Sequence, residues 1–301
     1  MAYAQTVEQI ARYVEKYGLS PQVIIPLRRG SNGIHYKVQC SSRQVVVVSI
    51  RPTAAEDRLW TAFHAQDHLT KAGLPSIRHL TSLQGETVLR VGDYSLVVTA
   101  YIAGRCGGPF SAVELSYIAS LLATVHQLRS PSRFPKRPSL FHLTERLLKD
   151  SNVAPLELAS WLRDHNWSNE GPPTDATPAG LVHGDLFADN VIITPQGPII
   201  IDWEGAALGP LIDDIAIALI GLCMTRGVLS LTNVRIFLDG YQAVRQLATC
   251  EHNALRKSIR DAAFNLIFRR AARFTSLDGS PVSGHAPARE LMHFLELFDQ
   301  I

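Results

Sequence analysis

One stretch of the chain, from Leu181 to Glu204, constrains the fold more than any other. Its sequence, LVHGDLFADNVIITPQGPIIIDWE, puts a polar turn between short apolar runs. The β-branched run 191–193 and the apolar run 198–201 each predict a strand, and the turn residues 195–197 predict that the two strands form a hairpin. A hairpin brings the residues at its two ends near each other, so this stretch is expected to organise a site.

Three side chains in this stretch have the chemistry of phosphoryl transfer. Asp185 lies in the polar turn, Asn190 follows it by five residues, and Asp202 comes directly after the second predicted strand. In phosphoryl transfer the protein mainly positions groups and neutralises charge, while Mg²⁺ bridges the nucleotide phosphates. Asp185 is the candidate catalytic base, and the oxygens of Asn190 and Asp202 are candidate Mg²⁺ ligands. Each residue alone could equally cap a turn, so the joint spacing carries the prediction.

The same stretch resembles the aminoglycoside-phosphotransferase-like (kinase-like) superfamily of small-molecule kinases. The motifs that carry the resemblance are HGDLFADN, IIDWE and the continuation GAALGPLIDDIAIALIGLC. The resemblance implies that Asp214 is a structural aspartate that braces the catalytic loop and that His183 orients this loop. We expect the neighbouring Asp213 to face solvent. The phrase DLFADNV at 185–191 is most similar to the homoserine-kinase-like branch.

The resemblance implies an α+β, protein-kinase-like bilobal fold. Residues 1–103 would form a small antiparallel β lobe with an N-terminal helix that binds the nucleotide, and residues 104–301 a larger, mostly helical lobe with the catalytic loop and the acceptor site. The implied activity is transfer of the γ-phosphate of ATP, with Mg²⁺, to a hydroxyl of a small metabolite. An amino alcohol such as homoserine or hydroxylysine is the leading acceptor. Two alternatives stay open, an antibiotic O-phosphotransferase and a non-catalytic nucleotide-binding pseudokinase.

The first lobe contains a candidate phosphate-binding loop. Gly30, Ser31 and Asn32 lie between two predicted strands, the first at 23–27. The backbone N–H groups of such a loop can lie over phosphates, although an ordinary β-turn uses the same residues. The position of this loop ahead of the catalytic stretch, and its resemblance to the family's nucleotide loop, favour phosphate binding.

The strand predicted at 44–51 should be the central strand of this lobe, and here the chain departs from the family. Ser49 occupies the position of the lysine that pairs with the phosphates, and Ala62 occupies that of its glutamate partner in the next helix. Losing both halves of an ion pair can be nearly neutral, whereas losing one leaves an uncompensated charge. Arg51 lies two residues on, on the same strand face. Ser49 and Arg51 are therefore candidate nucleotide-binding residues.

A strand predicted at 94–102 leads to the expected lobe boundary near residue 103. By resemblance, the backbone groups of Ala100 and Ile102 would form the hinge that meets the adenine. Tyr101 either packs on the base or belongs to the core.

Apolar residues at helical spacing predict helices in most of the remaining chain. The first predicted helix starts near Val7 and ends before Gly18. Further helices are predicted at 54–71, 111–128, 140–149, 156–165, 212–226, 232–248, 251–276 and 286–298. Residues 166–177, rich in Pro, Gly, Asn and Thr, predict a loop.

The charge pattern of the last part of the chain bears on the acceptor. Residues 231–301 contain nine basic and seven acidic residues. This balance supplies no acidic cleft for a polycationic aminoglycoside. A cluster of Arg269, Arg270 and Arg273 could instead bind a carboxylate or phosphate on the acceptor, or it could be a solvated helix face.

Composition argues against several other classes of protein. The formal net charge of +2, with basic residues scattered, gives no case for nucleic acid. The longest apolar run, 215–224, is too short to span a bilayer, and the first residues lack the apolar region of a signal peptide. Four cysteines without paired spacing predict small buried thiols in a reducing compartment: Cys40, Cys106, Cys223 and Cys250. We expect a cytoplasmic enzyme with a small-molecule hydroxyl acceptor and with no nucleic-acid or membrane partner.

Overall fold

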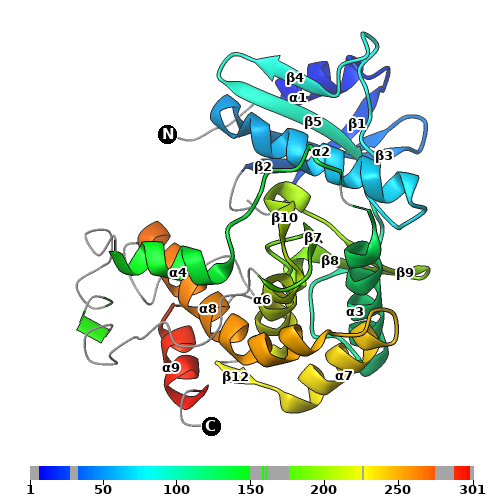
Figure 1. The fold of residues 1–301 in the computed structure, drawn as a ribbon. Helices are drawn as coiled ribbons and strands as arrows, with labels where there is room; N and C mark the ends of the chain where they lie inside the picture. The colour runs from blue at the N-terminus through cyan, green and yellow to red at the C-terminus, as the bar shows by residue number, and fades with distance from the viewer. Residues whose placement is uncertain are drawn as a thin grey trace. The chain divides into compact units, whose positions relative to one another are not determined.

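The structure is a computed structural model that describes residues 7–27, 33–129, 131–149, 158, 160–161, 176–225, 227–274 and 288–298. The chain divides into two compact units (Figure 1). The first comprises Met1–Gly104 together with Ile201–Glu204, and the second comprises Arg105–Ile200 together with Gly205–Ile301. An antiparallel sheet forms the centre of the first unit, and helices make up most of the second. The α+β fold class predicted from the sequence is confirmed.

The first unit is built on a five-stranded sheet in the order β1-β2-β3-β5-β4, with each neighbouring pair antiparallel. Its strands are β1 (Pro21–Pro26), β2 (Ile34–Cys40), β3 (Val45–Pro52), β4 (Val88–Val91) and β5 (Tyr94–Ala100). The valine run makes β3 the central strand, as predicted, because β-branched side chains pack well on a buried pleated surface. The predicted strands match β1, β3 and β5 with small shifts at their ends, whereas no bounds were predicted for β2 and β4.

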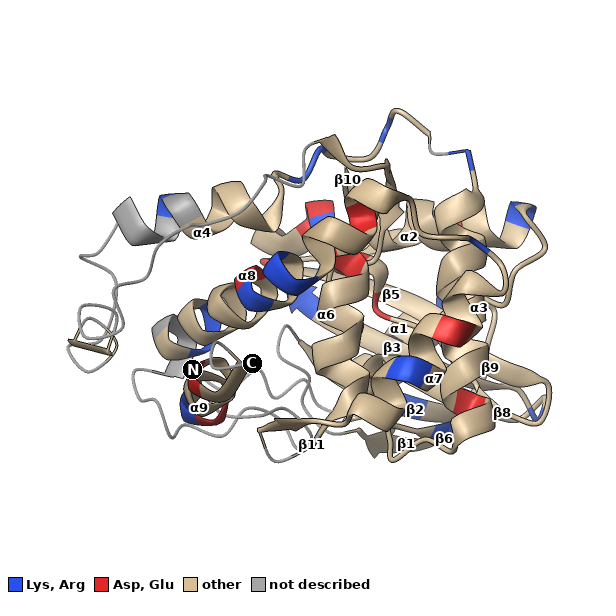
Figure 2. Ribbon diagram, turned by 60° about the horizontal axis from the view of Figure 1, so that its bottom comes forward, with Lys and Arg blue, Asp and Glu red and all other residues tan. Residues whose placement is uncertain are grey.

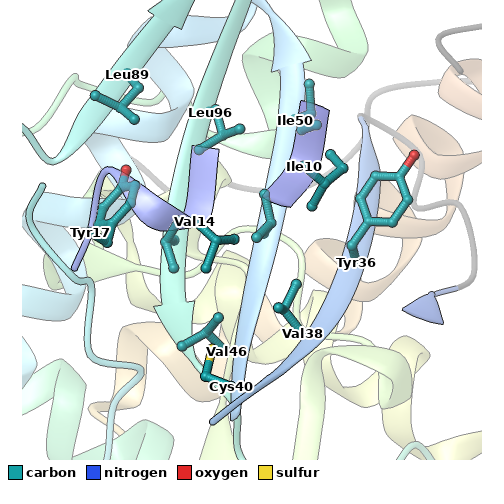
Figure 3. Packing of buried hydrophobic residues seen from close by; sticks show 12 residues of the cluster. Ile10, Val14, Tyr17, Tyr36, Val38, Cys40, Val46, Ile50, Leu89 and Leu96 are labelled. Atoms are coloured by element: carbon teal, nitrogen blue, oxygen red, sulfur yellow. The ribbon is translucent and has the colours of Figure 1, made fainter. Parts of the chain in front are cut away.

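Helix α1 (Val7–Glu15) packs against this sheet. Its buried Ile10 and Val14 share one hydrophobic cluster with side chains from β2, β3, β4 and β5 (Figure 3). Because the apolar residues of α1 recur at helical spacing, their burial ties one face of the helix to the sheet. Gly18 follows the helix with a φ of +71°, the left-handed conformation that glycine adopts most readily at a helix end.

Helix α2 (Glu56–Lys71) is joined to the sheet by a carboxylate at its first residue. Glu56 accepts hydrogen bonds from Arg90 of β4 at 2.7 and 2.8 Å and from Ser95 of β5 at 2.7 Å. The bonds from Arg90, and then from Ser95, lower the pKa of Glu56 to about 2. A short 3-10 turn, Thr53–Ala55, connects β3 to this helix.

The second unit is mostly helical (Figure 1). Its helices are α3 (Ala112–Gln127), α4 (Leu140–Lys149), α6 (Leu211–Cys223), α7 (Leu231–Gln242), α8 (Thr249–Phe274) and α9 (Ala288–Phe298). Helix α6 forms the centre, because nearly all of its side chains are buried and it packs against both α7 and α8. Helix α3 packs against α7, and α8 also packs against α4 and α9.

Short strands of the second unit frame the predicted catalytic stretch. They are β6 (Arg105–Cys106), β7 (Ala179–Val182), β8 (Val191–Thr194), β9 (Gly197–Ile200), β10 (Ala207–Pro210), β11 (Met224–Thr225) and β12 (Val228–Leu229). The predicted hairpin is confirmed as β8 paired with β9, and β6 joins it to make a three-stranded sheet. Strand β7 pairs with β10, and β11 with β12.

Helix α6 closely approaches the loop that follows β7. A Cβ atom at Gly221 would clash with the carbonyl oxygen of Leu186 and lie 3.0 Å from Cα of Phe187. A glycine in the middle of a helix costs stability, and here it lets the helix backbone support the loop directly.

The ends of two predicted helices are wrong. The helix predicted at 212–226 ends at Cys223, because Met224–Thr225 pairs with β12. The helix predicted at 232–248 ends at Gln242, six residues before its predicted end. Most residues of the helix predicted at 156–165 and of the loop predicted at 166–177 lie outside the described residues.

Two further expectations concern thiols and membranes. Cys40 and Cys223 are buried as expected, but Cys106 and Cys250 are exposed, and all four are free thiols. Within the described part of the chain, no helix has the length and apolar character that crossing a membrane requires.

Candidate active site

The predicted catalytic loop begins where β7 ends. Pairing with β10 sets Val182 opposite Ala207, and the chain then turns at Gly184 with a φ of +75°. The space that a side chain at Gly184 would need is filled by the guanidinium group of Arg137. Glycine is therefore required at this position both by backbone conformation and by packing.

Asp214, in the first turn of α6, holds the backbone of this loop. Its Oδ2 accepts a hydrogen bond from the N–H of His183 at 2.8 Å, and its Oδ1 accepts one from the N–H of Gly184 at 2.7 Å. Burial by itself raises the pKa of this carboxyl, but its hydrogen bonds, led by the one with His126, hold the pKa of Asp214 below its usual value. The ionised carboxylate thus fixes the two residues that precede Asp185.

Behind Asp214 lies a chain of polar side chains. Nε2 of His126, in α3, lies 3.1 Å from Oδ2 of Asp214, and Nδ1 of His126 lies 2.7 Å from the hydroxyl of Tyr241, in α7. The Tyr241 hydroxyl also accepts a hydrogen bond from Arg245 at 3.2 Å. Arg245 in turn donates to both carboxylate oxygens of the buried Glu251 at 3.0 Å. These side-chain hydrogen bonds connect the catalytic loop to α3, α7 and α8. The spacing of these residues in the sequence did not indicate that they would be hydrogen-bonded to one another.

The loop presents the side chain of Asp185 to solvent. This side chain is 38% exposed. The backbone carbonyl of Asp185 accepts hydrogen bonds from the N–H of Phe187 at 3.0 Å and from Nδ2 of Asn190 at 2.8 Å. The backbone N–H of Asp185 donates to Nδ1 of His183 at 3.2 Å. The structure therefore brings His183, Asp185 and Asn190 together.

Asp202 lies just beyond the hairpin. Because Val191 pairs with Ile200, Asn190 directly precedes one strand of the hairpin and Asp202 follows the other by two residues. Asp202 has a φ of +60°, a conformation that is unfavourable for a residue other than glycine and that concentrates at functional sites. The segment Ile201–Glu204 belongs to the first unit, whereas Asp185 and Asn190 belong to the second.

Ser49 and Arg51, the two candidates on β3, both have buried side chains. The hydroxyl of Ser49 lies 2.8 Å from Nδ1 of His35 on β2. Arg51 forms an ion pair with Glu204, and the two side chains are only 7% and 8% exposed. Burial, and then the charge of Arg51, lower the pKa of His35 to about 4. Sequence reasoning missed Glu204 as the partner of Arg51, because nothing in the local pattern marks it.

The other candidates for nucleotide binding are less defined. Three lie outside the described residues: Gly30, Ser31 and Asn32. At the end of β5, the N–H of Ala100 donates to the carbonyl of Arg78 at 2.9 Å, and Ile102 follows two residues later. The ring of Tyr101 lies 4.1 Å below the ammonium of Lys37.

The expectation that Asp213 faces solvent is wrong. Asp213 is only 5% exposed, and its Oδ2 accepts a hydrogen bond from the N–H of Leu140 at 2.8 Å. Leu140 is the first residue of α4, so the carboxylate meets the unpaired N–H groups and the positive end of this helix. The adjacent acids Asp213 and Asp214 therefore fix two different segments.

The predicted arginine cluster lies beside the catalytic loop. Nη1 of Arg269 is 3.9 Å from Oδ1 of Asp185. Arg270 is buried, with its guanidinium carbon 5.6 Å from the centre of the Phe187 ring. The side chain of Arg273 lies outside the described residues.

Arg137 joins these arginines from a segment that the motifs did not mark. Its backbone N–H donates to the carbonyl of Leu208 in β10 at 2.8 Å, which anchors the residue next to the loop. The available signal was the Pro- and Arg-rich composition of the connection between α3 and α4.

Comparison with known families decides what kind of protein has this site. A sequence profile of the family described as "Phosphotransferase enzyme family" matches residues 24–247. The chain belongs to this family. The resemblance that the catalytic stretch suggested is thus confirmed over most of the chain length.

Relatives of this phosphotransferase are kinases of small molecules. The homoserine kinase of Methylobacillus flagellatus is 26% identical over 269 residues, which cover 87% of this chain and 84% of the relative. The solved structure of amicoumacin kinase in complex with AMP-PNP, Ca²⁺ and Ami has a TM-score of 0.71 at 15% identity, covering 98% of this chain and 94% of that one. The microcompartment-associated aminopropanol kinase has a TM-score of 0.66 at 13% identity, covering 97% and 95%. The phosphotransferase is a small-molecule kinase with a kinase-like fold.

Proposed function

We propose that this phosphotransferase moves the γ-phosphate of ATP, with Mg²⁺, to the hydroxyl of a small amino alcohol such as homoserine or hydroxylysine. Asp185 would accept the proton of the attacking hydroxyl, a role that is typically worth about 10²–10⁴ in rate. One observation carries the proposal: Asp214 fixes the N–H groups of His183 and Gly184, while the side chain of Asp185 stays accessible. A catalytic base must be both held in position and open to its substrate, and this loop meets both needs.

The proposed metal ligands fit a hard divalent cation. The Nδ2 group of Asn190 donates a hydrogen bond within the loop, which leaves its amide oxygen free to ligate a metal. Asp202 would supply a carboxylate ligand. Mg²⁺ prefers such oxygen ligands, and it often uses few protein ligands together with phosphate oxygens and water. Bound there, it would neutralise charge on the transferring phosphate.

We assign nucleotide binding to the first unit. The proposed residues are Gly30, Ser31, Asn32, Ser49, Arg51, Ala100 and Ile102. For Arg51 we propose an indirect role, because its charge is paired with Glu204 in the segment that also contains Asp202. It would hold that segment rather than contact a phosphate.

The acceptor class is supported by two of the relatives. One is named homoserine kinase and another aminopropanol kinase, and both names describe amino alcohols. An antibiotic hydroxyl is the second candidate, because the amicoumacin kinase shares the fold over nearly the whole chain. Fold alone does not separate these acceptors, so the acceptor has to be tested directly.

The test is ADP release from Mg-ATP with a panel of hydroxy amino acids, amino alcohols, nucleosides and antibiotics. The wild type should respond to one acceptor class, and Asp185→Asn should lose turnover by at least about 10²-fold. Asp239→Asn, the same substitution at an exposed position in α7, is the matched control and should keep full activity. A signal that survives in Asp185→Asn would overturn the role of this base.

A further inference from the structure

We infer that Arg269, supported by Arg137 and Arg270, forms an anion-binding subsite beside Asp185 that holds the carboxylate of the acceptor. The inference rests on the proposed function and names the residue that would select the acceptor. It concerns the second unit alone, because all four residues belong to that unit.

Helix α8 brings a guanidinium within reach of the proposed base. Nη1 of Arg269 lies 3.9 Å from Oδ1 of Asp185, which is too long for a hydrogen bond but short enough for electrostatic attraction. The Arg269 side chain is 57% exposed, so a ligand in solution can reach it. Figure 2 shows basic residues at several places along α8. An acceptor whose hydroxyl meets Asp185 would therefore find a cation close by.

Arg270 adds a buried positive charge next to the catalytic loop. It is only 7% exposed and lies over the ring of Phe187, two residues after the proposed base. Burial lowers the pKa of Arg270 to about 10, which leaves the group charged at neutral pH. A buried cation is weakly screened, so its field strengthens anion binding near Asp185.

Arg137, which precedes α4, lies against the catalytic loop at the residue before Asp185. Its guanidinium lies against Gly184, and its Nη1 is buried without a hydrogen-bond partner among the described residues. Burial lowers the pKa of Arg137; the charge of Asp214 opposes this shift and that of Arg269 adds to it. The two guanidinium groups therefore lie within electrostatic reach of each other. Because the Nη1 atom is buried, Arg137 contributes its positive charge to the subsite rather than a hydrogen bond to the ligand.

The balance of charge decides the class of ligand. Arg269 lies 3.9 Å from Asp185, and Arg137 and Arg270 interact electrostatically with the same carboxylate. The carboxylates of Asp213 and Asp214 instead accept hydrogen bonds from backbone N–H groups. A polycationic acceptor would add to the repulsion, and a carboxylate would relieve it. The planar fork of arginine also matches a carboxylate with two parallel hydrogen bonds. A short hydroxy amino acid can place its hydroxyl at Asp185 and its carboxylate at Arg269.

The experiment compares two acceptors that differ only in the carboxylate, L-homoserine and 3-aminopropan-1-ol. Arg269→Gln should lower kcat/KM for homoserine by about 10- to 100-fold more than it lowers kcat/KM for 3-aminopropan-1-ol, the range expected when a charged hydrogen bond is lost. Arg256→Gln is the matched control, because Arg256 lies on the same helix and donates to the carbonyl of Phe298 at 2.7 Å. It should leave both values unchanged.

Each other outcome overturns the inference. Equal losses for both acceptors would show that Arg269 acts on Asp185 or on the transferred phosphate and not on the acceptor carboxylate. A wild-type preference for 3-aminopropan-1-ol would exclude a carboxylate subsite. If the wild type turned over neither compound, calorimetric titration would decide: homoserine must bind more tightly than 3-aminopropan-1-ol, and Arg269→Gln must remove the difference. If the two compounds bind with equal affinity, the inferred subsite is wrong. The acceptor panel with Asp185→Asn tests the kinase activity separately.

Discussion

Replacing Arg51 with methionine should strongly destabilise the protein. Arg51 and Glu204 form an ion pair in which both side chains are more than nine-tenths buried. Methionine keeps much of the apolar stem of arginine but removes its charge, so the carboxylate of Glu204 stays buried without this partner. The substitution therefore isolates the electrostatic part of the contact.

The burial of the pair sets the expected size of the effect. Removing one partner of a buried ion pair typically costs about 3–5 kcal/mol, whereas replacing both partners with apolar residues is often neutral or stabilising. Against a total stability of about 5–15 kcal/mol, such a loss is large. The double variant Arg51→Met/Glu204→Leu should recover most of it. Lys71→Met is the matched control: its partner Asp67 lies at 2.8 Å, but the Lys71 side chain is 71% exposed, so we expect less than about 0.5 kcal/mol.

Urea unfolding followed by circular dichroism measures these differences. A second readout is the pKa of His35, which should rise from about 4 in Arg51→Met because the charge of Arg51 helps to lower it. A loss below about 1 kcal/mol in Arg51→Met, or a double variant no more stable than the single one, would refute the reasoning.

Two further predictions follow from the same physical arguments. Tyr241→Phe removes the hydroxyl between His126 and Arg245, so it should lower the free energy of unfolding in urea by about 1–3 kcal/mol. It should also lower kcat more than it changes KM. An unchanged free energy of unfolding together with an unchanged kcat would show that these polar groups do not support the loop. Because the pKa of His35 is about 4 in the folded protein and near 6.5 when unfolded, the unfolded chain binds the extra proton between these values, and stability falls as pH falls through that window. His35→Gln should reduce that pH dependence by up to about 1.4 kcal/mol per pH unit, and an unchanged slope in pH-dependent unfolding would contradict the shift.

Local chemistry explains how much of the catalytic stretch could be predicted. The β-branched run, the turn residues and the second apolar run all lie within one short segment, and they gave the β8–β9 hairpin directly. The valine run of β3 likewise indicated a central strand, which the sheet order confirms. The end of α6 was missed because the two residues after it pair with β12 instead of continuing the helix.

What the sequence indicated by itself was the position of most helices, the β8–β9 hairpin, the family, and the residues of the candidate catalytic loop. Only the tertiary structure decided the partners of buried charges. Asp213 and Asp214 are adjacent and chemically identical, yet one meets the start of α4 and the other holds the catalytic loop. Arg51 meets Glu204, a residue far along the chain. Backbone propensity acts over a few neighbouring residues, whereas a buried charge must find whichever opposite charge or N–H group the packing of distant elements brings beside it.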